Sequence, residues 1–533
     1  MDHGPASSPS PVKPRVEPSP AVAASPSWVP AYWPLILVLI LQAALSARLL
    51  RADTAFEDEA AYLWAGHLEW ANLLHGTPLP QFPSYFSGAP VIYPPLAALA
   101  DSVGGLVAAR LLSLVFMLGA TTLLYFTARR LAGPWAAFFG AALFAVLGPT
   151  LHLGSYATYD AMALFLMALA AWLVVRAGDR TDATLWMAGA GVVLALANLT
   201  LYPSTLLDPV VILLALLVAL PKPGGRMAAS RALTLLAVVA VLVTGALLLG
   251  GSHYLHGVEI TTVNRVNDQD SPLAVLENST AWTGLAELVA IGGAVAAWIR
   301  RPRTATAWLM TLLAAAALLV PAEQAGLHSL ASLNKHVDMG MWFAAIAAGY
   351  ALERFITAAP AGRMRLITGL ACVVALCFPA AVGATQAKVF ATSWPNATAF
   401  VKILRPLADN GNGRLLVEDP SIAEYYLPSG TQWERWSSTR NIVLPGGSPT
   451  GGPSGKAGVV GPGNAGTYAT KVANGYFALV ALNFTDTTGL DKSIAADVRK
   501  NKHYKIIQVI PYGVGPDGKT PGTFIIWRYE PAK

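Results

Sequence analysis

The feature that most constrains this chain is a series of eleven long apolar segments, separated by polar connections. Each segment approaches the length of about 20 residues that a helix needs to cross the hydrocarbon core of a bilayer. Charged residues make up 12% of the 533 residues, whereas an ordinary soluble domain carries about 25%. These properties predict a polytopic α-helical membrane protein and exclude a conventional soluble enzyme. The segments lie at 33–50, 106–127, 134–150, 159–176, 183–200, 203–220, 231–250, 282–299, 304–321, 337–353 and 364–384.

The basic residues beside these segments predict how the chain is oriented in the membrane. On one side, the connections and segment ends carry 15 Lys and Arg residues, whereas the other side carries 4. Cytoplasmic loops are enriched in Lys and Arg, so we expect a cytoplasmic N-terminus. With an odd number of spans, the C-terminal part then lies outside the cytoplasm, at the plasma membrane of a bacterium. The net charge of +6 fits these orientation signals, and no nucleic-acid partner is expected.

Composition divides the chain into three parts. Residues 1–30 are rich in Pro, Ser and Ala and are predicted to form a disordered cytoplasmic tail. Residues 31–386 hold the spans and are expected to carry the catalytic site, with long external loops at 51–105, 251–281 and 322–336. Residues 387–533 alternate short strand and helix patterns and predict a small extracytoplasmic α/β domain. Its expected strands lie at 414–418, 476–483, 504–510 and 523–529, and its expected helices at 421–427 and 490–501.

The first external loop carries a cluster of acids, Glu57, Asp58 and Glu59, directly after the first span. The apolar residues that follow them keep a helical spacing, which predicts an amphipathic helix lying at the membrane surface. Acids in this position also stabilise the positive end of a helix dipole, which is the structural alternative to a functional role. Their place at the membrane surface favours a functional site.

A further acid, Asp160, follows Tyr159 at the external end of the fourth segment. An acid near a membrane boundary is costly unless it faces water or a partner. Capping of the helix near Thr158 is the structural alternative. On the same external face, His253 and His256 have a spacing that can place two metal ligands on one side of a helix, but they match no fixed metal motif. A divalent metal is therefore left open, and no cofactor is assigned.

These motifs together resemble the GT-C superfamily of integral-membrane glycosyltransferases. The most similar patterns are those of the bacterial protein O-mannosyltransferases and the lipid A aminoarabinose transferases. The resemblance runs from residue 30 to about 200 and is more diffuse up to 390. It is carried by Asp58-Glu59-x-x-Tyr62, Tyr93-Pro94-Pro95-Leu96, Ala109-Arg110-Leu111-Leu112-Ser113, Arg129-Arg130-Leu131 and Tyr159-Asp160-Ala161.

The resemblance implies a GT-C-like fold and a hexosyl- or pentosyltransferase that inverts the sugar carbon. The donor sugar would be carried on a polyprenyl phosphate, and the acceptor would be a hydroxyl of a protein, lipid or envelope glycan on the external face. The resemblance assigns catalysis to Asp58, with Glu59 as its neighbour, and to Asp160. The same assignment fits elementary chemistry, because a hydroxyl needs a carboxylate to take its proton as the sugar carbon develops positive charge. The expected pocket residues are Tyr62, Tyr93, Arg110 and Tyr159.

The sequence departs from the family pattern just before the paired prolines. Many relatives have a basic residue there, whereas this chain has Val91-Ile92-Tyr93. The cations that could instead bind the donor phosphate are Arg265, Lys335 and His336, all on the same predicted face. The structural alternative to phosphate binding is the same for each of these residues: a cation at the membrane interface whose side chain extends towards the lipid headgroups.

Two other functions are compatible with a polytopic chain. A secondary transporter or lipid-linked-sugar flippase would carry paired broken helices at the midplane and inverted repeats, and neither pattern is clear in this sequence. A non-catalytic envelope scaffold would not depend on any single acid. The position of the charges at one predicted face favours the glycosyltransferase.

Overall fold

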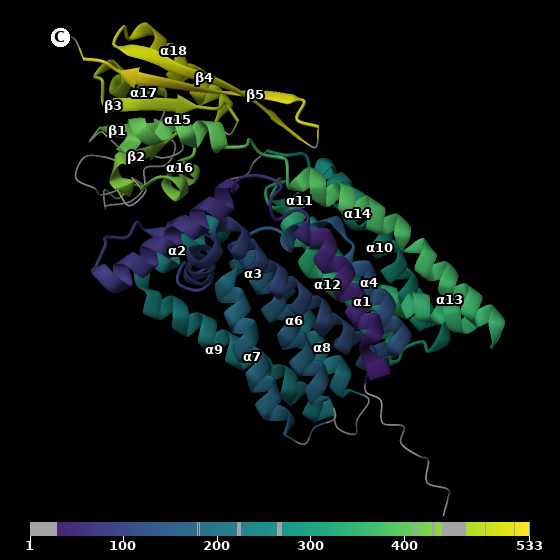
Figure 1. Cartoon of the computed structure of the whole chain (residues 1–533). Helices are drawn as coiled ribbons and strands as arrows, with labels where there is room; N and C mark the ends of the chain where they lie inside the picture. Colours follow the sequence, from purple (N-terminus) through teal and green to yellow (C-terminus); the bar gives the residue numbers. More distant parts are fainter. Residues whose placement is uncertain are drawn as a thin grey trace, which may run out of the picture.

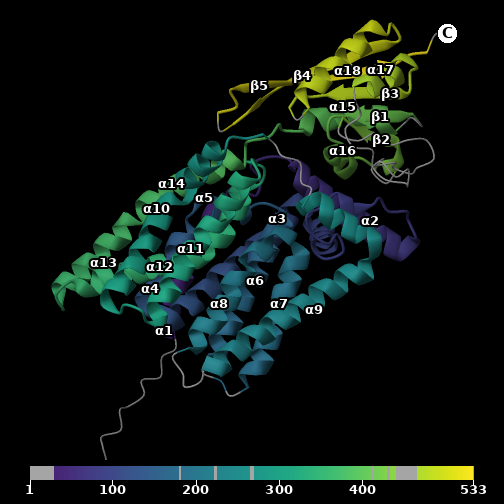
Figure 2. The same cartoon turned by 180° about the vertical axis from the view of Figure 1, so that it is seen from behind.

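The chain forms a bundle of long helices with a small α/β layer seated on one end (Figure 1). This computed structural model describes residues 29–178, 180, 182–220, 225–263, 269–409, 413–428, 432–439, 465–485, 487–515 and 517–531. The predicted tail, up to residue 28, lies outside this description. The first turn of α1 lies at the end of the bundle opposite to the α/β layer, as the two opposite views agree (Figures 1 and 2).

Helices occupy all eleven segments that hydropathy predicts to span the membrane. They are α1 (Val29–Ala47), α3 (Tyr93–Ala132), α4 (Pro134–Ala145), α6 (Tyr159–Ala177), α7 (Ala183–Thr200), α8 (Asp208–Ala219, preceded by the 3-10 turn η2, Tyr202–Leu207), α9 (Gly225–Val258), α10 (Pro272–Arg300), α11 (Ala305–Gly326), α12 (Leu333–Ala358) and the pair α13 (Arg363–Ala375) and α14 (Cys377–Phe390). Within the described residues, eight helical stretches are long and apolar enough to cross a membrane, judged by length and composition.

The other three predicted spans, α1, α4 and α12, differ in length or polarity. α4 and the apolar part of α1 (Tyr32–Ala47) are shorter apolar helices. α12 is long, but it carries polar residues such as Lys335, Asp338 and Glu353. It is buried along most of its length between α4, α10 and α11. A helix enclosed by other helices does not need an apolar surface all round, which explains its weaker hydropathy.

The segment predicted as the first external loop is largely helical and lies directly over the bundle. It contains α2 (Glu57–His75), which confirms the predicted helix, whereas its place at a membrane surface stays a prediction. α2 ends at Gly76, whose φ of 69° suits glycine. α3 begins at Tyr93, and not near residue 106 as predicted. A break at Gly104 and Gly105 divides it, with Gly105 in the left-handed region at φ 64°. The part of α3 before this break therefore belongs to the loop that covers the site.

The α/β layer contains a five-stranded sheet in the order β2-β1-β3-β5-β4. β1 runs parallel to both β2 and β3, whereas β5 pairs antiparallel with β3 and β4. One apolar cluster packs α15 and α16 on one face of the sheet, and another packs α17 and α18 on the other face. The elements are α15 (Thr398–Asp409), β1 (Arg414–Val417), α16 (Ser421–Tyr426), β2 (Trp436–Ser438), α17 (Ala465–Ala473), β3 (Phe477–Leu482), α18 (Thr488–Lys500), β4 (Tyr504–Val514) and β5 (Thr520–Tyr529).

All four predicted strands of this layer are present, whereas β2, α15 and α17 were not predicted. β2 has only three residues and α17 follows a Gly-rich run, so neither leaves a clear periodic pattern. In α15, Phe400, Leu404 and Ala408 do keep a helical spacing, so this helix could have been predicted. The layer is joined to the segment between α1 and the break in α3 by specific hydrogen bonds. The backbone N–H of Ala55 donates to the Tyr426 hydroxyl at 2.8 Å, and the Tyr425 hydroxyl donates to Asp101 Oδ1 at 2.7 Å.

Candidate functional site

Lys335, in the first turn of α12, brings together acids from two other helices. Its Nζ donates to Asp58 Oδ2 at 2.6 Å and lies 3.9 Å from Asp160 Oδ2. Asp58 is in the first turn of α2 and Asp160 in the first turn of α6. Three helix N-termini therefore meet at one point, and each brings the positive end of its dipole to it.

His336 extends this cluster on the side of Asp160. Its Nε2 lies 3.4 Å from Asp160 Oδ1, and its Nδ1 lies 3.0 Å from the Gln324 amide nitrogen. Because that amide nitrogen can only donate, Nδ1 accepts and the ring proton is on Nε2, facing the carboxylate. Both Asp160 oxygens are buried without a hydrogen bond of ordinary geometry to the described residues. The Lys335 ammonium and the His336 ring N–H are therefore the groups that face this buried carboxylate, which makes Asp160 a candidate for a functional role.

The members of the cluster differ in their access to solvent. The Asp58 side chain is 31% exposed, whereas those of Lys335 and Asp160 are 7% and 0% exposed. Lys335 also lies over the buried ring of Tyr156, with its Nζ 5.7 Å from the ring centroid. Asp58 is therefore the most accessible of these groups to an incoming molecule, and Lys335 and Asp160 lie beneath it.

Glu59 lies in a separate buried ion pair with Arg110. The guanidinium donates to both carboxylate oxygens, from Nε at 2.8 Å and from Nη2 at 2.7 Å, and both side chains are almost fully buried. Glu59 also accepts from the backbone N–H groups of Phe56 and Ala157. Arg110 uses its remaining donors on the carbonyl oxygens of Leu50, Asp53 and Thr54. The pair therefore fixes the start of the first loop against α3 and α6.

The predicted pocket tyrosines lie next to one another. The Tyr62 ring centroid is 4.4 Å from that of Tyr159 and 6.3 Å from that of Tyr93. The Tyr93 hydroxyl is 3.3 Å from Ser113 Oγ. Of the three tyrosines, Tyr62 lines the cavity that also contains Asp58. Tyr93 and Tyr159 pack against the ring of Tyr62.

That cavity, of about 200 Å³, lies between α2 and the α/β layer, and we call it the catalytic cavity after the role that the sequence resemblance implies for Asp58. Besides Asp58 and Tyr62, it is lined by Glu424 of α16 and by Trp433, neither of which the sequence singled out. Burial raises the pKa of the Glu424 carboxyl well above its usual range, and the nearby Asp419 carboxylate adds to this effect. A neutral carboxyl can donate a hydrogen bond as well as accept one.

Two solved structures share this architecture over nearly the whole chain. ArnT from Cupriavidus metallidurans in the apo state aligns with a TM-score of 0.58 and 14% identity, over 92% of this chain and 97% of ArnT. ArnT bound to undecaprenyl phosphate aligns with a TM-score of 0.56 and 14% identity, over 93% of this chain and 98% of ArnT. The chain has the GT-C fold.

The GT-C assignment agrees with a sequence match and with a more distant structure. Residues 90–248 match the family described as dolichyl-phosphate-mannose-protein mannosyltransferase. The oligosaccharyltransferase AglB from Archaeoglobus fulgidus, in complex with an inhibitory peptide and a dolichol-phosphate, aligns with a TM-score of 0.53 and 14% identity, over 95% of this chain and 75% of AglB. No curated protein matches the sequence. The chain therefore resembles these membrane glycosyltransferases in fold, and over residues 90–248 in sequence as well.

The remaining predicted residues of this GT-C chain do not join the cluster. Arg265 lies outside the described residues, and so does the side chain of His253. His256 Nδ1 lies 3.8 Å from Glu259 Oε2, and both side chains are more than half exposed. In the described part of the chain, no group of three or more His, Cys, Asp and Glu side chains could hold a metal ion.

The acids of the cluster do not fit a divalent metal as they stand. Metal sites of this class need several oxygen ligands around one point. Here the Lys335 ammonium lies within 3.9 Å of carboxylate oxygens from both Asp58 and Asp160. It already supplies the positive charge that a metal would bring, so no step of the reaction proposed below uses a metal.

Chelation is therefore expected to leave sugar transfer unchanged. Treatment of the purified protein with EDTA, followed by removal of the chelator, should alter the rate by less than about twofold, because in the reaction proposed below the Lys335 ammonium would meet the leaving phosphate in place of a metal. The rate is measured before and after addition of Mg²⁺ or Mn²⁺. A large loss that Mg²⁺ or Mn²⁺ restores would place a metal in the mechanism.

Proposed function

We propose that this chain transfers a sugar from a polyprenyl-phosphate donor to an acceptor hydroxyl in the catalytic cavity. The observation that carries the proposal is the convergence of Asp58, Asp160, Lys335 and His336 at the N-termini of three helices. We further propose that this end of the bundle faces the outside of a bacterial plasma membrane. The separation of the α1 start from the α/β layer in Figures 1 and 2 supports that orientation.

Lys335 and His336 are assigned to the donor phosphate. An anion is stabilised at helix N-termini, where backbone N–H groups and the dipole both favour negative charge. Lys335 adds a full positive charge at the same point. In the proposed complex, the ammonium turns from Asp58 to the phosphate, while Asp160 keeps Lys335 and His336 in position. ArnT bound to undecaprenyl phosphate and AglB bound to dolichol-phosphate support a lipid phosphate as the ligand class.

Asp58 is assigned to the acceptor. As the acceptor oxygen forms its bond to the sugar C1, its proton passes to the Asp58 carboxylate, and the C1–O bond to the phosphate breaks. The phosphate leaves with the bonding electrons, and Lys335 stabilises its charge. Attack opposite to the leaving group inverts C1. Release of Lys335 to the phosphate frees the carboxylate for the proton, so donor binding and activation of the base are coupled.

Glu59 and Arg110 are assigned to positioning, because all their charged atoms are engaged in the buried pair described above. The pair fixes the first turn of α2 and with it the direction of Asp58. Asp160 is likewise a positioning residue, since it is buried and contacts Lys335 and His336. Tyr62 borders the space in which the acceptor would lie.

The proposal is tested on the lipid that the protein retains. Lys335→Met should lower the amount of copurifying polyprenyl phosphate or its sugar conjugate, because one lost charge-assisted contact costs about 1.5–3 kcal/mol. This corresponds to about a 10–150-fold lower affinity. The measurement is mass spectrometry of extracted lipid per mole of folded protein, and the mass of the bound sugar would also name the donor.

Two variants control this experiment. Lys335→Arg keeps the charge and should retain most of the lipid, and Lys388→Met removes an exposed lysine at the end of α14. Thermal unfolding shows whether each variant is folded. Undiminished lipid in folded Lys335→Met would place the phosphate elsewhere and contradict the assignment.

A further inference from the structure

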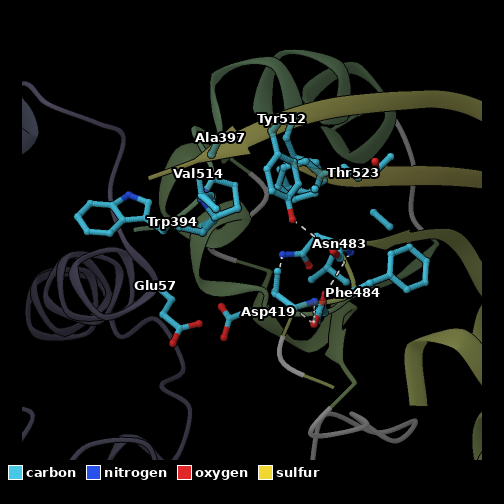
Figure 3. Close-up of a pocket in the computed structure, with 18 of the residues that line it drawn as sticks. Glu57, Trp394, Ala397, Asp419, Asn483, Phe484, Tyr512, Val514 and Thr523 are labelled. Atoms are coloured by element: carbon cyan, nitrogen blue, oxygen red, sulfur yellow. Dashed lines mark hydrogen bonds between the residues drawn. The ribbon is translucent and has the colours of Figure 1, made fainter. Parts of the chain in front are cut away.

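A second and larger cavity, of about 550 Å³, lies at the carboxyl edge of the sheet, facing the bundle (Figure 3). It is lined by the segments that follow β1 and β3, by parts of β4 and β5, and by Phe56 and Trp394 from the bundle side. The crevice outside the carboxyl ends of parallel strands is a common place for ligands in α/β folds. Its volume lies in the range of about 300–1,000 Å³ that small-ligand pockets have. The reaction proposed above does not use it.

This larger cavity borders the catalytic cavity. Glu57 and Asp419 line both of them, and Glu57 is the neighbour of Asp58 in α2. Figure 3 shows these two side chains next to each other at the border of the larger cavity. A ligand bound in the larger cavity can therefore extend past this pair of carboxylates towards Asp58. The larger cavity is placed to hold the part of an acceptor that adjoins the reacting hydroxyl.

The side chains of the larger cavity suit a neutral saccharide. Aromatic rings border it on two sides: Phe524 stacks on Phe400 at 4.6 Å on the sheet side, and Phe56 lies 5.1 Å from Trp394 on the bundle side. The apolar faces of sugar rings pack on such surfaces. The polar groups between them are carboxylates, an amide and hydroxyls, which accept hydrogen bonds from sugar hydroxyls. Among the described residues that line the cavity there is no Lys, Arg or His, which disfavours phosphorylated or acidic ligands.

An extended peptide has fewer contacts to make at this edge. Of the strands that reach this cavity, β1, β3 and β5 each have a strand on both sides, and β4 alone has an edge that a peptide strand could pair with. The backbone N–H groups of Asn483 and Thr485 already donate to Glu418, at 3.1 and 2.8 Å. The cavity is lined by aromatic side chains and by side-chain hydrogen-bond acceptors. Such groups recognise a saccharide without backbone pairing.

We infer that the larger cavity is an acceptor subsite for a neutral saccharide residue next to the one that receives the new sugar. The inference rests on the proposed glycosyl transfer and narrows its acceptor to a glycan or glycoconjugate. The aromatic walls hold the saccharide, and Glu57 and Asp419 orient the hydroxyls that face the catalytic cavity.

The inference is tested by binding of the purified full-length protein to an array of neutral and anionic glycans. Wild type and Asp58→Asn should both bind a set of neutral glycans, because the subsite is separate from the catalytic carboxylate. Thr523→Trp fills the cavity from β5 and should lower this binding at least about tenfold. Asp419→Asn keeps the shape and the contact to the Ser421 N–H but removes the charge, and should also weaken binding. The control Thr470→Trp, on the exposed side of α17, should bind normally.

The outcomes separate this inference from the proposed function. Binding of neutral glycans without any donor cleavage would retain the subsite and reject the transfer reaction. Absence of neutral-glycan binding, a preference for anionic glycans, or full binding by folded Thr523→Trp would overturn the subsite. Tetralysine serves as a further probe, and its binding in place of glycans, with loss in Asp419→Asn, would assign the cavity to a cationic peptide instead. If thermal unfolding shows that Thr523→Trp is not folded, glycan binding by Asp419→Asn decides the outcome.

Discussion

Asp58→Asn is expected to lower sugar transfer by about 10²–10⁴-fold, the usual contribution of a positioned general base. The amide has nearly the shape of the carboxylate but cannot take the acceptor proton. The rate is measured as sugar transferred from a polyprenyl-phosphate donor per mole of folded protein, with the variant and wild type in the same membranes or micelles.

Two comparisons make this result specific to Asp58. Glu69→Gln removes another acid of α2, away from the cluster, and should transfer sugar normally. If Asp58 only stabilised the start of α2, the amide would serve nearly as well and activity would survive. Near wild-type transfer by folded Asp58→Asn would remove this residue from the mechanism.

Glu59→Gln is expected to destabilise the protein and not to act on the chemical step alone. Removing one partner of a buried ion pair leaves the other charge uncompensated, which costs about 3–5 kcal/mol. Here the charge left behind is the Arg110 guanidinium, which is 2% exposed. The loss should be seen as a lower unfolding temperature and a lower yield of folded protein in detergent.

The double variant Glu59→Met with Arg110→Met provides the matched control. It removes both charges together but leaves the backbone groups that the pair binds without partners, so a stability above that of Glu59→Gln would show that the uncompensated charge is the larger cost. Glu59→Gln with wild-type stability but strongly reduced transfer would instead support the catalytic role that the sequence resemblance assigned to Glu59.

The helices and strands could be predicted because their signals are local. All eleven apolar segments fall on helices, and the acidic stretch after the first span begins the predicted α2. Four of five strands were predicted from short apolar runs. The ends were less accurate: α3 begins earlier than predicted, because a glycine break inside it looks like the end of a loop. Hydropathy also cannot tell the buried α12 from helices that face lipid.

The assembly of the site could be predicted only in part. The predicted spans place Asp58, Asp160, Lys335 and His336 on the same face of the membrane. No local sequence pattern shows that Lys335 lies between the two acids. Glu59 has the same composition signal as Asp58, and consecutive helical residues point about 100° apart. Only the packing of Arg110 shows which acid turns inward. Glu424 reaches the catalytic cavity from a distant domain, so no sequence signal could have identified it.

We propose that this chain breaks the bond between a sugar and a polyprenyl phosphate at the Asp58–Lys335 cluster. This is tested by measuring the release of polyprenyl phosphate from labelled donors by the reconstituted protein, with an envelope glycan fraction as acceptor. Wild type should release polyprenyl phosphate in equal amount to the sugar transferred, and Asp58→Asn should release it at least about a hundredfold more slowly. Movement of the intact donor across the bilayer without cleavage would contradict the account and favour a flippase.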